Sequence, residues 1–281
     1  MLTSAFADSL RRRFGYQFPR LGARGMNWCL SHMPSAIDCE LFPGIRVNMN
    51  LGDLTQRSTF WQGSRFEAPT AQILARFGAG AKVFFDIGSN YGFFSYWTLH
   101  RLPGIEVYAF EPNPKTFETM RRARLENSLN RLHPQRVGLS DSVGRLDLHP
   151  GTKDSGHSTF AQHPDLNAPP VANVPVVTFD GWAEGTGLAE PVFGEWIAKI
   201  DVEGFELKVL TGMRKALLRR AFRLIVVEVN QFTRALAGIA PEHLNEFLND
   251  MGYFQPERLN GVSQTELEKS GNGFFVPGSK S

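Results

Sequence analysis

The chain has 281 residues, is 42% hydrophobic and carries a formal net charge of +2, so it can bury a sizeable core but gives no electrostatic reason to expect nucleic acid as a partner. Its two cysteines, Cys29 and Cys39, provide neither a disulfide framework nor the ligands of a zinc site. No apolar run reaches the length of a signal peptide or a transmembrane helix, so we expect a cytoplasmic protein with no membrane span.

The N-terminal quarter of the chain lacks the rhythm of alternating strands and helices. Residues 1–70 carry scattered aromatics, a cluster of arginines and one short alternating run, Ile45–Leu51. We interpret this part as a cap or arm that contacts the substrate or a second copy of the chain in a homodimer. Trp61, Phe66 and Glu67 are candidates for the acceptor side of a site, with packing as the alternative for the two aromatics.

From residue 71 to residue 281 short apolar runs alternate with helical stretches, which predicts an α/β domain with a doubly wound, mainly parallel sheet. The predicted core strands are Lys82–Asp86, Ile105–Glu111, Gln135–Leu139, Trp196–Asp201 and Leu224–Asn230. Helices are predicted over residues 92–101, 114–129 and 205–219 and around residues 244–251. We expect Gly271–Pro277 to add a final antiparallel strand at the edge of the sheet.

Residues 144–180 interrupt this rhythm. Arg145–His149 and Val174–Phe179 are predicted as strands around a loop rich in glycine, serine and proline. We interpret the segment as an insertion that overhangs the site.

The segment VFFDIGSNYG, from Val83 to Gly92, predicts a cofactor turn between a buried strand and a helix. Its spacing, DxGxxxG, differs from the dinucleotide pattern GxGxxG, and Asp86 would repel a phosphate. A cationic ligand with an amino-acid head suits it better, and S-adenosylmethionine is the natural candidate. Tyr91 lies inside the turn, where it would touch the methionine part, while capping of the next helix is the alternative role of Asp86.

Polar residues also end the second and third predicted strands. Glu111 ends the run EVYAFE and suits the two hydroxyls of a ribose. Ser140 and Asp141 follow at the same edge, where Asp141 would accept from the adenine amino group, although a plain turn residue is the alternative.

Several motifs, in this order along residues 67–230, resemble the FkbM family of S-adenosylmethionine-dependent methyltransferases: DIGSNYG, AFEPNPKTFETM, LENSLN, VGLSD, VPVVTFD, KIDVEGFELKVLTG and VVEVN. The resemblance implies a Rossmann-like class I methyltransferase fold, with a seven-stranded sheet whose last strand is antiparallel. It also implies O-methylation of a hydroxyl on a small metabolite, sugar or glycan. The cofactor residues that it implies are Asp86, Gly88, Asn90, Gly92, Glu111, Ser140 and Asp141, and Ser89 stands where the family often has alanine.

Methyl transfer to a hydroxyl needs a general base, or a metal ion that lowers the pKa of the hydroxyl. Asp201, Glu228 and Asn230 follow the fourth and fifth strands and are one hypothetical ligand set for Mg²⁺. Without a metal, Asp201 or Glu203 would act as the base or position the acceptor, and helix capping is the alternative for Glu203. His157, in the loop DSGHSTF, is another candidate base, with a solvated surface role as its alternative.

Three other functions stay open at this point. An N-methyltransferase would share the fold, and a non-catalytic protein would keep the cofactor residues alone. A nucleotide-sugar or nicotinamide oxidoreductase is disfavoured by the missing GxGxxG. The acceptor itself, whether a small molecule or a carbohydrate, has no diagnostic motif.

Overall fold

The computed structural model describes residues 9, 35–150, 158–160, 169–188, 193–229, 241–256, 258–259, 262–263 and 271–278. Two candidate site residues from the sequence, His157 and Asn230, lie outside these ranges.

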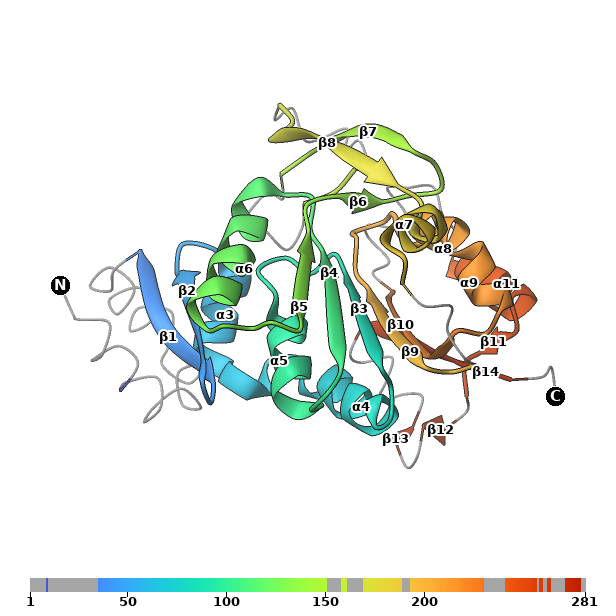
Figure 1. Ribbon diagram of the computed structural model, residues 1–281, viewed down its shortest axis with the longest axis horizontal. Helices are drawn as coiled ribbons and strands as arrows, with labels where there is room; N and C mark the ends of the chain where they lie inside the picture. Colours follow the sequence, from blue (N-terminus) through green and yellow to red (C-terminus); the bar gives the residue numbers. More distant parts are fainter. Residues whose placement is uncertain are drawn as a thin grey trace.

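A seven-stranded sheet forms the centre of the molecule, in the order β11-β14-β10-β9-β3-β4-β5 (Figure 1). Its strands are β3 Val83–Ile87, β4 Glu106–Phe110, β5 Leu132–Gln135, β9 Trp196–Ile200, β10 Phe222–Glu228, β11 Tyr253–Phe254 and β14 Asn272–Pro277. Neighbours from β5 to β10 pair in parallel, whereas β14 is antiparallel to both β10 and β11. The predicted mainly parallel sheet with an antiparallel last strand is confirmed.

Two of the sequence predictions for this sheet were wrong in detail. Strand β14 lies between β10 and β11 and is therefore not at the edge. The third strand is Leu132–Gln135, earlier than the predicted Gln135–Leu139. Pro134 disguises it in the sequence, but a proline is tolerated there because β5 is an edge strand with one paired side.

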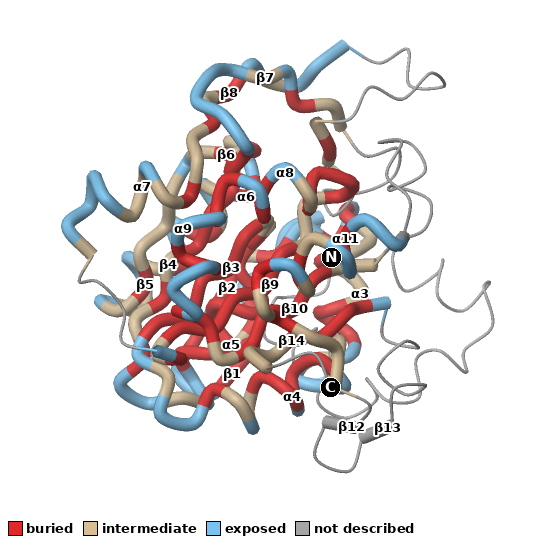
Figure 2. The backbone as a smooth tube through the Cα atoms, turned by 90° about the vertical axis from the view of Figure 1, so that its right-hand side faces the viewer, coloured by how far each residue is buried: buried red, intermediate tan, exposed pale blue. Residues whose placement is uncertain are grey.

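The central strands are buried on both faces, as parallel strands between two helical layers must be (Figure 2). Successive residues of β3 point to opposite faces, so Phe84 joins one hydrophobic core and Phe85 the other. The first core is covered by α3 Leu54–Gln62, α4 Ala68–Gly78, α5 Phe93–Arg101 and α6 Pro114–Glu126. The second is covered by α7 Phe179–Thr186, α8 Glu206–Gly212, α9 Arg214–Leu218 and α11 Pro241–Asp250.

The predicted helix over residues 205–219 is two helices, because α8 ends at Gly212 and Met213 leaves helical geometry. A Cβ on Gly212 would lie 2.1 Å from the carbonyl oxygen of Ser140, so α8 runs directly against the chain that follows β6 Gly138–Leu139.

Residues ahead of the sheet form an antiparallel hairpin, β1 Ala36–Phe42 and β2 Ile45–Asn50. Its alternating side chains Ile45, Val47 and Met49 are buried in the first core, and Phe42 packs 5.7 Å from Phe93 of α5, ring centre to ring centre. The division into a cap of residues 1–70 and a domain of residues 71–281 stays a prediction, as does the role of the cap.

The insertion carries two strands, β7 and β8, which form a small sheet with β6 of the chain before it, in the order β6-β8-β7, drawn at the top of Figure 1. Strand β7 is Gly144–Leu148 and β8 is Ala172–Val177, one or two residues from the predicted strands. A short pair, β12 Arg258–Leu259 and β13 Val262–Ser263, and a 3-10 turn, η2 Gly63–Arg65, complete the described elements. In the described ranges no helix has both the length and the apolar character needed to cross a membrane.

Candidate active site

The carboxyl ends of β3, β4, β9 and β10 meet at one edge of the sheet, since these strands are parallel. Strand β3 lies between β4 and β9, so the chain reverses its winding direction there, which is where α/β sheets bind ligands. Two adjoining cavities open at this edge. One of about 40 Å³, the β4-side cavity, includes Glu111 in its wall, and one of about 170 Å³, the β9-side cavity, includes Lys199.

The turn after β3 forms the wall that the two cavities share. Gly88 has a φ of +80°, and a Cβ there would lie 1.8 Å from the carbonyl oxygen of Asp201. Only glycine allows the turn to approach β9 this closely. Asn90 also adopts a left-handed backbone, with a φ of 52°, and Gly92 precedes α5 with a φ of 98°.

Glu111 is buried at the end of β4 and held by two backbone donors. The amide of Asn90 donates to its Oε2 at 2.7 Å, and the amide of Asn113 donates to its Oε1 at 2.8 Å. Burial raises the pKa of Glu111 to about 7, although these hydrogen bonds oppose the shift. Each carboxylate oxygen keeps a lone pair for a further donor, so the group suits two vicinal hydroxyls.

Asp86 is buried at the end of β3 and accepts a hydrogen bond from Oγ of Ser95 on α5, at 2.6 Å. Burial raises its pKa to about 6, while the charge of Lys199 opposes that shift. Tyr91 borders the β9-side cavity, and its hydroxyl donates to Oγ1 of Thr59 on α3 at 2.5 Å. Ser89 is buried and directs its hydroxyl to the carbonyl oxygen of Phe110 at 3.3 Å.

The structure places the two predicted adenine residues beside the β4-side cavity rather than in its wall. Among the described residues that line this cavity, neither Ser140 nor Asp141 occurs. Oγ of Ser140 donates to Oδ1 of Asp141 at 3.1 Å, and Asp141 is exposed. The residues just before them, Val137, Gly138 and Leu139, line the wall instead. Further residues of the wall that the sequence analysis did not single out are Ile87, Phe110, Pro112, Leu148, Ser158, Phe160 and Val202.

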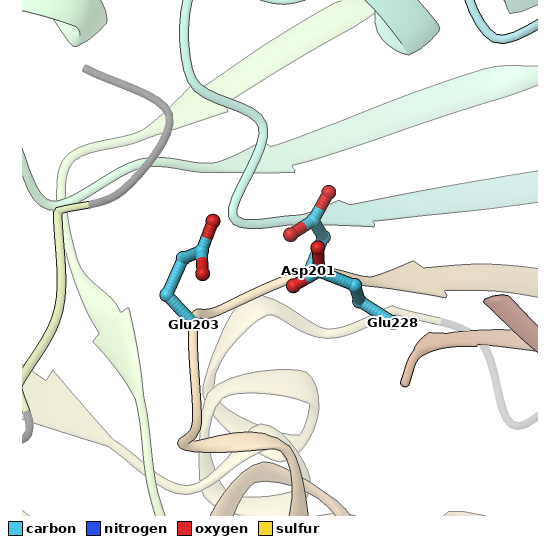
Figure 3. Close-up of side chains that lie close together, drawn as sticks. All are labelled: Asp201, Glu203 and Glu228. Carbon is cyan, nitrogen blue, oxygen red and sulfur yellow. The ribbon is translucent and has the colours of Figure 1, made fainter. Parts of the chain in front are cut away.

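Three carboxylates gather where the two cavities meet (Figure 3). One oxygen each of Asp201, Glu203 and Glu228 lies within 4.8 Å of the others. Glu228 ends β10, and burial together with the charges of Asp201 and Glu203 holds its pKa well above the ordinary value. The predicted metal set thus gains Glu203 beside Asp201 and Glu228.

The loop that carries Glu203 is fixed from two sides. Glu203 has a left-handed φ of 51°, and its carbonyl oxygen accepts from Oγ1 of Thr159 in the insertion at 2.7 Å. Oε1 of Glu206 accepts from the amides of Val202 and Gly204, at 3.2 and 3.1 Å. Glu206 therefore holds the loop before α8, whereas Glu203 borders both cavities.

Lys199 is a buried residue of this site that the sequence analysis did not single out. Its Nζ lies 2.5 Å from Oδ2 of Asp201 and 4.7 Å from the ring centre of Phe94. Burial lowers the pKa of Lys199, but the carboxylates of Asp201, Glu67 and Asp86 outweigh this, so the pKa is raised.

Of the three aromatic and acidic candidates for the acceptor side, two line the β9-side cavity. Phe66 and Glu67 border it together with Thr55. Trp61 is buried in the first hydrophobic core, where it packs edge to face on Phe60.

Comparison with known proteins agrees with this geometry. Residues 86–254 match the family model described as the methyltransferase FkbM domain. The chain is 27% identical over 186 residues to the hexuronic acid methyltransferase AglP of Haloferax volcanii, covering 66% of this chain and 69% of that relative. It is 27% identical over 164 residues to the 2-O-methyltransferase NoeI of Sinorhizobium fredii, covering 54% of this chain and 65% of that relative.

Solved structures include a more distant match. The methyltransferase FkbM from Methylobacillus flagellatus aligns with a TM-score of 0.49 and 14% identity over 80% of this chain and 55% of that chain.

A doubly wound sheet with a glycine turn and a buried acid after its first two central strands defines the class: a Rossmann-like, S-adenosylmethionine-dependent class I methyltransferase. Within that class the chain belongs to the FkbM methyltransferase family, whose model matches more than half of it. Membership in this family favours a methyltransferase over an oxidoreductase and over a non-catalytic protein.

Proposed function

We propose that this enzyme transfers the methyl group of S-adenosylmethionine to a hydroxyl of a carbohydrate. The observation that carries the proposal is the group of carboxylates from Asp201, Glu203 and Glu228, which stands where the cofactor turn meets the larger cavity. The names of two relatives, a hexuronic acid methyltransferase and a 2-O-methyltransferase, support a sugar as the acceptor.

The residues of the β4-side cavity fit the adenosine part of this cofactor. Glu111 offers its carboxylate to the ribose hydroxyls, and apolar walls such as Phe110 and Leu139 suit a base. A Cβ on Gly88 would collide with the carbonyl oxygen of Asp201, so glycine keeps the cofactor turn and the end of β9 together in this wall. When bound, the cofactor supplies an electrophilic methyl group on a sulfonium.

Glu203 is the proton acceptor in this proposal. A sugar hydroxyl must lose its proton as it becomes a nucleophile, and a carboxylate beside it takes that proton. Asp201 is less suited, because its Oδ2 already accepts a hydrogen bond from the ammonium of Lys199 at 2.5 Å. Asp201 instead fixes the acceptor hydroxyl in line with the methyl group. The roles predicted for His157 and Asn230 stay predictions.

The test is an assay of S-adenosylhomocysteine release with neutral and acidic sugar glycosides as acceptors, with the methylated product located by mass spectrometry. Glu203→Gln should lower kcat by about a hundredfold, the contribution typical of a general base. Its affinity for S-adenosylmethionine should stay near that of the wild type. An unchanged kcat would remove Glu203 from this role, and no release of S-adenosylhomocysteine with any of these acceptors would overturn carbohydrate methylation.

A divalent cation is a second candidate, favoured by the oxygen-only donor set of Asp201, Glu203 and Glu228. These three residues would hold Mg²⁺, which would supply a lower pKa to a hydroxyl beside it. On this candidate, enzyme stripped with a chelator loses its activity and regains it with magnesium. Full activity after stripping would eliminate the metal.

A further inference from the structure

Glu67 reaches the acceptor side of the site from outside the matched family domain. It precedes α4, while the family match begins at Asp86. Together with Phe66 and Thr55 it lines the β9-side cavity, opposite the ends of β9 and β10. The segment ahead of the domain therefore completes this cavity and is placed to decide what enters it.

The backbone of Glu67 is held in an uncommon conformation. Its φ of 46° and ψ of 39° are left-handed, which costs free energy for a residue other than glycine. The side chain makes no capping hydrogen bond to α4, so the helix start does not account for the glutamate. Asn90 and Glu203, two other residues with a positive φ, border the same cavity.

The titratable side chains around Glu67 are mostly acids. The acids that line the β9-side cavity are Glu67, Asp86, Asp201, Glu203 and Glu228. Among its described lining residues one cation, Lys199, faces them, and its ammonium contacts Asp201. Burial raises the pKa of Glu67 above its ordinary value, although the charge of Lys199 opposes this shift. An acceptor carboxylate entering this cavity would meet like charges on the ionised acids. Acceptor hydroxyl groups would instead donate hydrogen bonds to these acids.

We propose that Glu67 binds the acceptor through hydrogen bonds from its hydroxyls and selects neutral sugars over uronic acids. This rests on the proposed function, because it names the substrate class of the same site. It separates this enzyme from its relative that is named for a hexuronic acid, although the two are 27% identical over 186 residues.

The test compares matched pairs of acceptors that differ only in one carboxylate: the methyl glycosides of glucose, galactose and mannose and the corresponding methyl uronides. At mildly alkaline pH the wild type should have the higher kcat/KM with the neutral member. Glu67→Gln removes the charge at nearly constant size. It should lower kcat/KM for the neutral sugars by about tenfold or more, as expected for a lost charged hydrogen bond, while the uronides lose less or gain.

Two controls separate selection from stability. Glu67→Asp keeps the charge and should keep the preference for neutral sugars. Glu118→Gln removes an exposed carboxylate of α6 that pairs with Arg121, and it should change neither acceptor. S-adenosylmethionine binding, measured by calorimetry, should be the same in all variants.

The outcomes are distinct. Equal losses on both members of each pair, or a wild type that prefers the uronides, would overturn the selection and leave carbohydrate methylation standing. A wild type that binds S-adenosylmethionine but methylates none of these sugars would overturn the proposed function and the selection with it.

Discussion

Lys199 compensates the charge of the acidic end of the sheet. Its side chain is 4% exposed, and it faces Asp201 directly, with the charges of Glu67 and Asp86 nearby. A buried carboxylate that loses its partner is strongly destabilising, because its desolvation is no longer offset. The ammonium of Lys199 therefore stabilises the folded protein more than the surface ion pairs do.

Lys199→Met tests this role. We expect the free energy of unfolding, measured with urea, to fall by about 3 kcal/mol or more. Lys82→Met is the matched control, since Lys82 also pairs with a glutamate, Glu195, but is 70% exposed. The control should change stability by at most about 1 kcal/mol. Similar effects of the two substitutions would contradict the compensating role of Lys199.

At the level of single residues, the sequence points out acids at strand ends more readily than residues whose place depends on distant contacts. Asp86 and Glu111 are recognisable because each ends an apolar run and is followed by a turn signal, glycine or proline. Lys199 looks like any polar residue inside a strand, and nothing local shows that Asp201 will be its partner. The place of Glu67 depends on a left-handed backbone and on packing against strands more than a hundred residues away.

Among the elements, α7 holds the break between α8 and α9 in place. The carboxylate of Asp180 on α7 accepts from the backbone amides of Lys215 and Ala216, at 2.8 and 3.1 Å. These are first-turn amides of α9, which has no capping side chain of its own at Met213. A residue of a different helix therefore supplies the cap.

Asp180→Ala should lower the free energy of unfolding by about 1 to 2 kcal/mol, the usual loss for an N-terminal cap. Glu184→Ala is the control, because Glu184 lies one turn further along α7 and pairs with Lys215 on the surface. It should cost at most about 0.5 kcal/mol, measured by urea unfolding in the same buffer. The cap would be refuted by an Asp180 variant as stable as the Glu184 variant.

Element boundaries follow from the sequence to within one residue where a strand is mostly apolar, as in β3 and β9. The predicted boundaries are wrong where tertiary contacts decide which residues form the strand or helix. The polar segment Leu132–Gln135 is a strand because β4 pairs with it, and Gly138–Leu139 pairs with β8 in the insertion. The last residue of α8, Gly212, lies against the carbonyl oxygen of Ser140, a contact that no local pattern encodes.

For the molecule as a whole, the buried acids of the site link stability to pH. Burial raises the pKa of Glu111 from 4.5 to about 7 and that of Asp86 from 3.8 to about 6. At a pH between the ordinary and the raised pKa of each group, the folded protein binds more protons than the unfolded chain. The stability from these groups is therefore complete at low pH and is lost as the pH rises toward about 7.

Glu111→Gln isolates this effect, because glutamine does not titrate. Between pH 4.5 and 7 the free energy of unfolding of the wild type without cofactor should fall relative to that of the variant by roughly 3 kcal/mol. Urea unfolding of both proteins across this pH range gives the difference directly. A difference that does not change with pH would show that the pKa of Glu111 is the same in the folded and the unfolded protein, and would contradict this link.

Two properties of the whole molecule stay predictions: assembly as a homodimer and a cytoplasmic location. The hairpin of β1 and β2 and the helices that follow it share the first hydrophobic core with α5. This segment therefore contributes to the core of the single chain, whether or not it also contacts a second copy.

The most direct test of the central claim is titration calorimetry of S-adenosylmethionine into the wild type, Glu111→Gln and the surface control Glu118→Gln. We expect one cofactor per chain in the wild type and the control, and an affinity lower by about tenfold or more in Glu111→Gln, since the variant loses charged hydrogen bonds to the ribose. No binding to folded wild type, or equal affinity in all three proteins, would contradict a cofactor site built on Glu111.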